Sequence, residues 1–225
     1  MIPLVLLPGM MCDGRMWGQM AQAALVLIPP PGLDSFAAMA GHLLPLMPPR
    51  FALAGLSMGG ILAMEILRQA PDRLDRLALL DTNPLAEAPA VQARRNPQMA
   101  RARAGDLASV IRDDMKPGYL APGPDRQALL DLCMDMALGL GVPYFVSQSR
   151  ALAARRDQCA TLRGYAGPAL VLMGAEDRLC PRDRHDLMHA LMPQSRLVVI
   201  AGAGHLPTLE KPLETTAELR RWLEE

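Results

Sequence analysis

The sequence predicts an α/β protein with a doubly wound, mostly parallel sheet of about six strands and a helical cap insertion. The first observation is a series of short, almost entirely apolar runs separated by helical patterns, at residues 3–7, 24–28, 51–56, 77–80, 169–173 and 197–200. Such runs are typical of strands buried on both faces of a parallel sheet. The second is a serine between two glycines, where one of these runs meets a helical pattern. The third is a long helical stretch without a strand pattern.

That helical stretch divides the chain. We expect residues 1–85 and 167–225 to form the core domain, and residues 86–166 to form a helical cap. The cap contains eleven basic and eight acidic side chains and is interrupted by prolines. A solvated helical surface explains this charge pattern, with an anionic substrate as the alternative. We also predict that apolar cap residues face the pocket or the core below it and favour apolar acyl groups, namely Leu129, Leu132, Met136, Leu138 and Phe145.

Composition gives no sign of a charged macromolecular partner. Basic and acidic residues number 23 each among 225 residues, so we expect no nucleic-acid or membrane partner and a small-molecule substrate instead. We expect a monomer or small homo-oligomer. The apolar N-terminus lacks a basic region, and no uninterrupted apolar run reaches about 18 residues, so we expect a cytoplasmic protein. The four cysteines are widely spaced, which predicts reduced thiols, no metal and no cofactor.

The glycine-flanked serine is Ser57, in the stretch "FALAGLSMGGILAMEILRQAP". Glycines at 55 and 59 give the pattern G-x-S-x-G, in which a sharp turn between a strand and a helix exposes a nucleophilic serine. The apolar run before the serine suits a strand, and the pattern after it suits a helix that ends at Pro71. A glycine-rich turn with an ordinary serine is the alternative, so the rest of the chain must decide.

A serine nucleophile needs a histidine base and an acid that orients the base. Of the four histidines, His205 lies just beyond the last predicted strand, and Asp177 follows the preceding one. The carboxyl ends of parallel strands are where α/β sheets build their sites, so we expect Ser57, Asp177 and His205 to meet there. Asp81 also follows a predicted strand and is the alternative acid.

The order serine, acid, histidine is that of the α/β-hydrolases, and four segments together resemble that family. They are "LVLLPGMMCDGRMW", "AGLSMGG", "GAEDRLCP" and "GAGHLPTLEKP". The resemblance covers nearly the whole chain outside the cap. It implies an oxyanion hole formed by the backbone N–H groups of Met10 and Met58. Pro8 stands where relatives commonly carry a histidine, and we expect a sheet of six strands without the two that usually precede the first predicted one.

A serine at this position favours acyl transfer over the reactions of relatives that carry aspartate there. We therefore expect a serine hydrolase that cleaves a small-to-medium carboxylic ester through an acyl-enzyme intermediate. Hydrolysis of an enol-lactone or a carbon–carbon bond in a small carboxylated metabolite is the alternative reaction. A non-catalytic ligand-binding module on the same fold is the alternative from another class.

Overall fold

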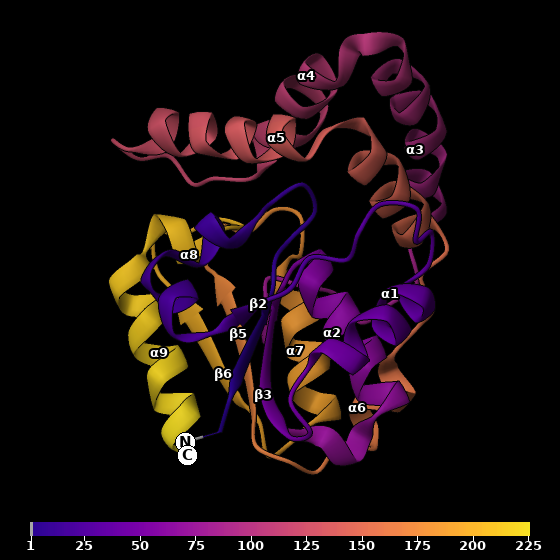
Figure 1. Cartoon of the computed structure of the whole chain (residues 1–225). Coiled ribbons are helices and arrows are strands. Elements are labelled where there is room, and N and C mark those ends of the chain that lie inside the picture. The colour runs from indigo at the N-terminus through magenta and orange to yellow at the C-terminus, as the bar shows by residue number, and fades with distance from the viewer. Residues whose placement is uncertain (1) are drawn as a thin grey trace.

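The computed structural model describes residues 2–225, and its centre is a six-stranded sheet in which every paired strand is parallel (Figure 1). The strand order is β2-β1-β3-β4-β5-β6. The bounds are Leu4–Leu7 for β1, Leu25–Val26 for β2, Phe51–Leu56 for β3, Leu74–Leu80 for β4, Ala169–Gly174 for β5 and Arg196–Ile200 for β6. All six predicted strands are present, which confirms the predicted fold class.

Successive side chains of a strand point to opposite faces, and both faces of this sheet are covered. Val5 and Leu7 of β1 belong to one apolar cluster, whereas Leu4 and Leu6 belong to another. The helices packed on the first face are α1 (Phe36–Leu43), α2 (Met58–Gln69), α6 (Cys159–Arg163) and α7 (Arg182–Leu191). The other face is covered by the helical turns of Gly14–Ala23, by α8 (Pro207–Glu210) and by α9 (Pro212–Glu224). This double coverage explains why the strands read as continuous apolar runs.

The segment between β4 and β5, residues 81–168, consists of helices and irregular loops and contains no strand. It contains α3 (Pro89–Arg101), α4 (Leu107–Ser109) and α5 (Arg126–Ala153), joined by irregular helical turns. Figure 1 shows α3, α4 and the first part of α5 beyond the carboxyl ends of the strands. The division into a core domain and a cap at residues 86 and 166 remains a prediction.

Helix α5 bends sharply at Gly141, whose φ is 79°, two residues before Pro143. By its length and mean hydropathy alone, α5 is long and apolar enough to cross a membrane. Its second half nevertheless packs into the protein core, where Phe145 is fully buried. The second half is therefore part of the globular core, whereas only 28% of the most apolar window of α5 is buried.

Candidate active site

Ser57 lies on the turn between β3 and α2, with φ 55° and ψ −117°. A positive φ is rare for residues other than glycine, and such strain clusters at functional sites. The backbone N–H of Ser57 donates to the carbonyl of Leu80 at 2.9 Å, which anchors the turn to β4. A Cβ atom at Gly59 would overlap the backbone carbonyl of Leu7, and one at Gly55 would overlap that of Gly59. The two glycines of the motif are therefore required by close packing of the backbone.

The structure brings Ser57, Asp177 and His205 together, as the sequence predicted. The Oγ atom of Ser57 lies 2.8 Å from Nε2 of His205, and Nδ1 of His205 lies 2.9 Å from Oδ2 of Asp177. His205 and Asp177 are almost completely buried. This arrangement lets the imidazole take a proton from the serine while the carboxylate fixes the tautomer of the ring.

The environment of Asp177 keeps it ionised. Burial raises the pKa of its carboxyl, but the His205 ring and the N–H groups of Leu179 and Cys180 favour the charged form more strongly and hold the pKa below its usual value. Those two N–H groups donate to Oδ1 at 2.8 and 3.1 Å. Oδ2 thereby remains free to accept from His205.

Asp81, the alternative acid, has a different partner. Its Oδ1 accepts a hydrogen bond from the Gly174 N–H at 2.8 Å, and it makes no hydrogen bond to His205. Full burial, followed by the neighbouring charge of Asp177, raises the pKa of Asp81 well above its usual value. The geometry therefore favours Asp177 as the acid and leaves Asp81 hydrogen-bonded to the end of β5.

The two residues expected to supply oxyanion donors flank the nucleophile. Met58 is the first residue of α2, a position where a backbone N–H has no partner within the helix. Met10 follows β1, and its neighbours on both sides are fixed: the N–H of Gly9 contacts Met16 Sδ at 3.1 Å, and that of Met11 donates to Gln148 Oε1 at 2.9 Å. The methionine side chains themselves pack into the apolar core.

Two residues outside the predicted set hold the loop that carries His205. Oε2 of Glu210 accepts from the N–H groups of Gly204 and Ala121 at 2.9 and 2.7 Å, and its Oε1 accepts from Leu206 at 3.0 Å. The carbonyl of Tyr119 accepts from the His205 N–H at 2.7 Å. Glu210 lies within "GAGHLPTLEKP", so an acidic side chain five residues after the histidine was the available signal.

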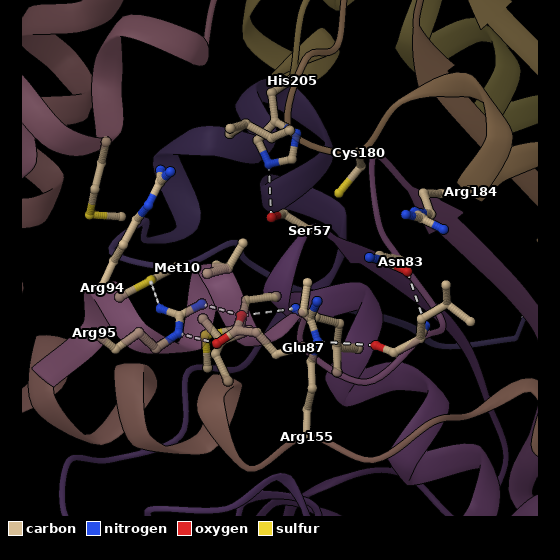
Figure 2. A pocket seen from close by; sticks show the side chains of 18 of the residues that line it. Met10, Ser57, Asn83, Glu87, Arg94, Arg95, Arg155, Cys180, Arg184 and His205 are labelled. Atoms are coloured by element: carbon tan, nitrogen blue, oxygen red, sulfur yellow. Dashed lines mark hydrogen bonds and ion pairs between the residues drawn. The ribbon is translucent and has the colours of Figure 1, made fainter.

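A pocket of about 460 Å³ opens onto Ser57 and His205 (Figure 2). Of the apolar residues predicted to face the pocket or the core below it, Met136 and Phe145 are buried in the core, Leu129 and Leu132 pack on an apolar cluster, and Leu138 is 47% exposed. Four of these residues thus pack on the core, which was one of the two predicted placements, whereas the prediction was wrong for Leu138, in the half of α5 that precedes the bend at Gly141. The lining contains Leu85, Val91, Met115, Leu152 and Leu179, together with charged side chains.

Cys180 also lines the pocket, and burial raises the pKa of its thiol well above the usual value. A neutral thiol is a poor nucleophile and a poor metal ligand.

Atoms of Asp177, Cys180 and His205 lie within 4.8 Å of one another. Both ring nitrogens of His205 already face hydrogen-bond partners, so a cation here would compete with Ser57 and Asp177. All four cysteines are free thiols.

Comparison with known proteins identifies one family and several relatives. A model described as "Alpha/beta hydrolase family" matches residues 4–219. The biotin biosynthesis bifunctional protein BioHC of Cellvibrio japonicus is 25% identical over 98% of this chain and 47% of its own length. A pimeloyl-[acyl-carrier protein] methyl ester esterase of Aromatoleum aromaticum is 28% identical over 76% of this chain and 72% of its own length.

A solved structure shows the same likeness in three dimensions. The thermophilic esterase of Thermogutta terrifontis, determined with malate bound, is 28% identical, with a TM-score of 0.90 over 100% of this chain and 90% of its own. Against the bifunctional relatives, by contrast, the chain spans a little under half of their length. The likeness to those proteins therefore concerns one of their parts.

Proposed function

Because the chain belongs to the α/β-hydrolase family, we propose that it hydrolyses small-to-medium carboxylic esters through a serine acyl-enzyme intermediate. The observation that carries this proposal is the hydrogen-bonded series Ser57–His205–Asp177, with distances of 2.8 and 2.9 Å. The methyl ester esterases and the thermophilic esterase among its relatives support ester cleavage over other reactions of the fold.

In the first half of the reaction, Oγ of Ser57 attacks the ester carbonyl while Nε2 of His205 takes the hydroxyl proton. The carbonyl oxygen becomes an oxyanion that the N–H groups of Met10 and Met58 stabilise. When the C–O bond breaks, His205 returns the proton to the departing alcohol. The product of this half is an ester between the acyl group and Ser57.

In the second half, water replaces the alcohol. His205 takes a proton from the water, the hydroxide attacks the acyl carbonyl, and the same N–H groups stabilise the second oxyanion. Collapse of this intermediate returns the proton to Ser57 Oγ and releases the carboxylic acid. Asp177 remains ionised throughout and stabilises the imidazolium that forms twice in each cycle.

The helices over the carboxyl ends of the strands serve as a cap in this proposal, and the pocket beneath them takes a small-molecule substrate in the cytoplasm. Lactone hydrolysis uses the same machinery and differs only in that the leaving alcohol stays attached to the acid. A non-catalytic binding module has no need of the aligned hydrogen bonds at Ser57 and His205. These bonds therefore favour an enzyme.

The test combines active-site titration with a substrate screen. A serine-reactive aryl phosphonate should modify one residue per chain, Ser57, as read by mass spectrometry, and should abolish turnover of aryl esters. Ser57→Ala should remove both labelling and turnover while the protein stays folded. Ser149→Ala is the matched control, because that buried hydroxyl makes no hydrogen bond within residues 2–225.

Near wild-type turnover by Ser57→Ala would rule out the serine mechanism. Side-by-side rates on aryl esters of increasing acyl length and on an anionic enol-lactone then separate the two reactions. Preference for the lactone by a factor of about 100, equal to about 2.7 kcal/mol, would replace ester cleavage as the proposed reaction.

A further inference from the structure

The pocket beside Ser57 is rich in arginine. Four guanidinium groups line it, those of Arg94, Arg95, Arg155 and Arg184, against two carboxylates. The chain as a whole carries no net charge, so this concentration of positive charge is local. Its meaning depends on how many of the four arginines are already neutralised within the protein.

Two of the arginines share one carboxylate. Glu87, whose side chain is 1% exposed, forms a bidentate ion pair with Arg95, and its Oε1 lies 3.6 Å from Nη1 of Arg155. Arg155 also donates from Nε to the Leu85 carbonyl at 3.1 Å. One negative charge therefore faces two positive charges, and the cluster of Glu87, Arg95 and Arg155 keeps a net charge of +1.

The electrostatics of Arg155 agree with this balance. Burial lowers the pKa of its guanidinium, the charge of Glu87 opposes that effect, and the positive charges of Arg95 and Arg184 add to it. A buried cation next to two further cations and one carboxylate lacks a counter-charge.

The other two arginines have no strong partner inside the pocket. Arg94 forms no ion pair or hydrogen bond with any side chain in residues 2–225, and Arg184 reaches only the exposed Asp183, at 3.6 Å. Asp114, the second carboxylate of the lining, is held at 2.9 Å by Arg101, which lies outside the pocket. Figure 2 shows Arg94 and Arg184 on opposite sides of the Ser57–His205 pair.

We propose that Arg94 and Arg184 each form an anion subsite, one on either side of the Ser57–His205 pair, and that the ester this protein cleaves carries a separate carboxylate that binds at one of them. This inference rests on the proposed function and names its substrate class. The cluster of Glu87, Arg95 and Arg155 supplies a further positive field and fixes the wall between the two arginines. Guanidinium groups match carboxylates in a planar, two-bond geometry.

The charged group can lie on either side of the ester bond, so the experiment has two arms. The acyl arm compares methyl pentanoate with monomethyl glutarate. The acyl chain of the first ester ends in a methyl group, and that of the second ends in a carboxylate. The alcohol arm compares propyl acetate with 3-acetoxypropanoate, which differ in the same way. Turnover is followed by acid release at constant pH. We expect the anionic member of one pair to have a kcat/KM about 10 to 100 times higher, as a charged hydrogen bond provides.

One of the variants Arg94→Met and Arg184→Met, the one on the side where the charged group binds, should remove most of that preference by raising KM for the anionic ester, with little change for its neutral partner. Arg103→Met is the matched control, because Arg103 is an exposed arginine of the same helical segment outside the pocket. Glutarate should also protect the wild-type protein against thermal unfolding and the two pocket variants less.

Equal kcat/KM within both pairs, or a preference that survives both pocket variants, would overturn the anion subsite while leaving ester cleavage intact. Loss of the serine mechanism would show differently, since neither neutral ester would then be cleaved and the phosphonate would not label Ser57. Glutarate protection that is the same in all variants would also count against the subsite.

Discussion

The side chain of Gln148 accepts a hydrogen bond from the backbone N–H of Met11, with 2.9 Å between Oε1 and N. Gln148 lies in the buried half of α5, and Met11 follows the residue expected to donate to the oxyanion. Met11 has a φ of 56°, which costs a residue with a side chain about 1–3 kcal/mol. The inserted helices thus hold a strained loop of the candidate active site in place.

We expect Gln148→Leu to lower kcat by about 10- to 100-fold with a smaller change in KM, because a buried N–H left without an acceptor would relax the loop and move the Met10 N–H. Steady-state kinetics on a neutral aryl ester measure this. Gln127→Leu is the control, since Gln127 is exposed on the same helix and pairs only with Asp131. A wild-type kcat in Gln148→Leu would show that the loop holds its shape without this bond.

Replacement by asparagine should have very different effects on kcat at the two neighbouring carboxyl groups, Asp177 and Asp81. Asp177→Asn should lower kcat about 10⁴-fold, because an amide at this position fixes the wrong tautomer of His205. Asp81→Asn should leave kcat within about threefold, since an amide resembles the neutral carboxyl and its oxygen still accepts from Gly174. A severe loss in Asp81→Asn together with an active Asp177→Asn would reverse the acid assignment.

Asp81 also affects stability with a definite sign. The pKa of Asp81 is raised in the folded state, so the folded protein holds this proton more tightly than the unfolded chain does. The stability that follows is fully present below the ordinary aspartate pKa and is lost as the pH rises through the raised pKa. Asp81→Asn removes this loss. The variant should therefore have a higher melting temperature than wild type at neutral pH, and the difference should shrink on acidification; a lower melting temperature at pH 7 would contradict this.

Glu210 is a positioning residue, because its carboxylate accepts three backbone N–H groups around His205. Glu210→Gln leaves one good acceptor for three donors, so the loop should shift and kcat should fall about tenfold or more, with KM little changed. The pH profile of kcat/KM should move as well, because His205 would lose alignment with Asp177. Glu214→Gln, at an exposed position, serves as the control. An unchanged pH profile would assign Glu210 a purely structural role.

His185 makes the fold sensitive to acid. It is fully buried, and desolvation lowers the pKa of its ring from 6.5 to about 4, although Pro181 O lies 3.3 Å from Nδ1. As the pH falls, His185 therefore binds a proton in the unfolded chain before it does so in the folded protein. The free energy of unfolding should fall by on the order of 3 kcal/mol as the pH drops from about 6.5 to 4. Urea unfolding across this range measures the loss. It should persist in His42→Gln, at an exposed site, and shrink in His185→Leu.

The sheet was predictable because its strands lie between two layers of helices. Both sets of alternating side chains are buried, as for Leu6 and Leu7, so each strand stands out as an apolar run. The site was predictable for a related reason. In a parallel sheet the residues after successive strands share one edge, which places Ser57, Asp177 and His205 together without knowledge of side-chain packing.

The pocket walls were not predictable in this way. Whether a helical residue such as Leu138 faces the pocket depends on the bend at Gly141, and the sequence does not give the direction of that bend. Pairings such as Gln148 with Met11 join residues 137 positions apart and follow no local pattern. The burial of Glu87 between two arginines likewise arises only from the packed helices.

The hydrogen bond between Ser57 and His205 links residues separated by 148 positions, and the inserted helices lie between β4 and its sheet neighbour β5. During synthesis on the ribosome, the proposed nucleophile Ser57 therefore emerges long before Asp177 and His205, the proposed acid and base. A nascent chain that has formed its first four strands carries an inert serine at the carboxyl end of β3, next to the strand β4, which still lacks its partner β5. Hydrolytic capacity should arise abruptly, when β5 and β6 pair at the end of folding, so the appearance of phosphonate labelling would report completion of the sheet.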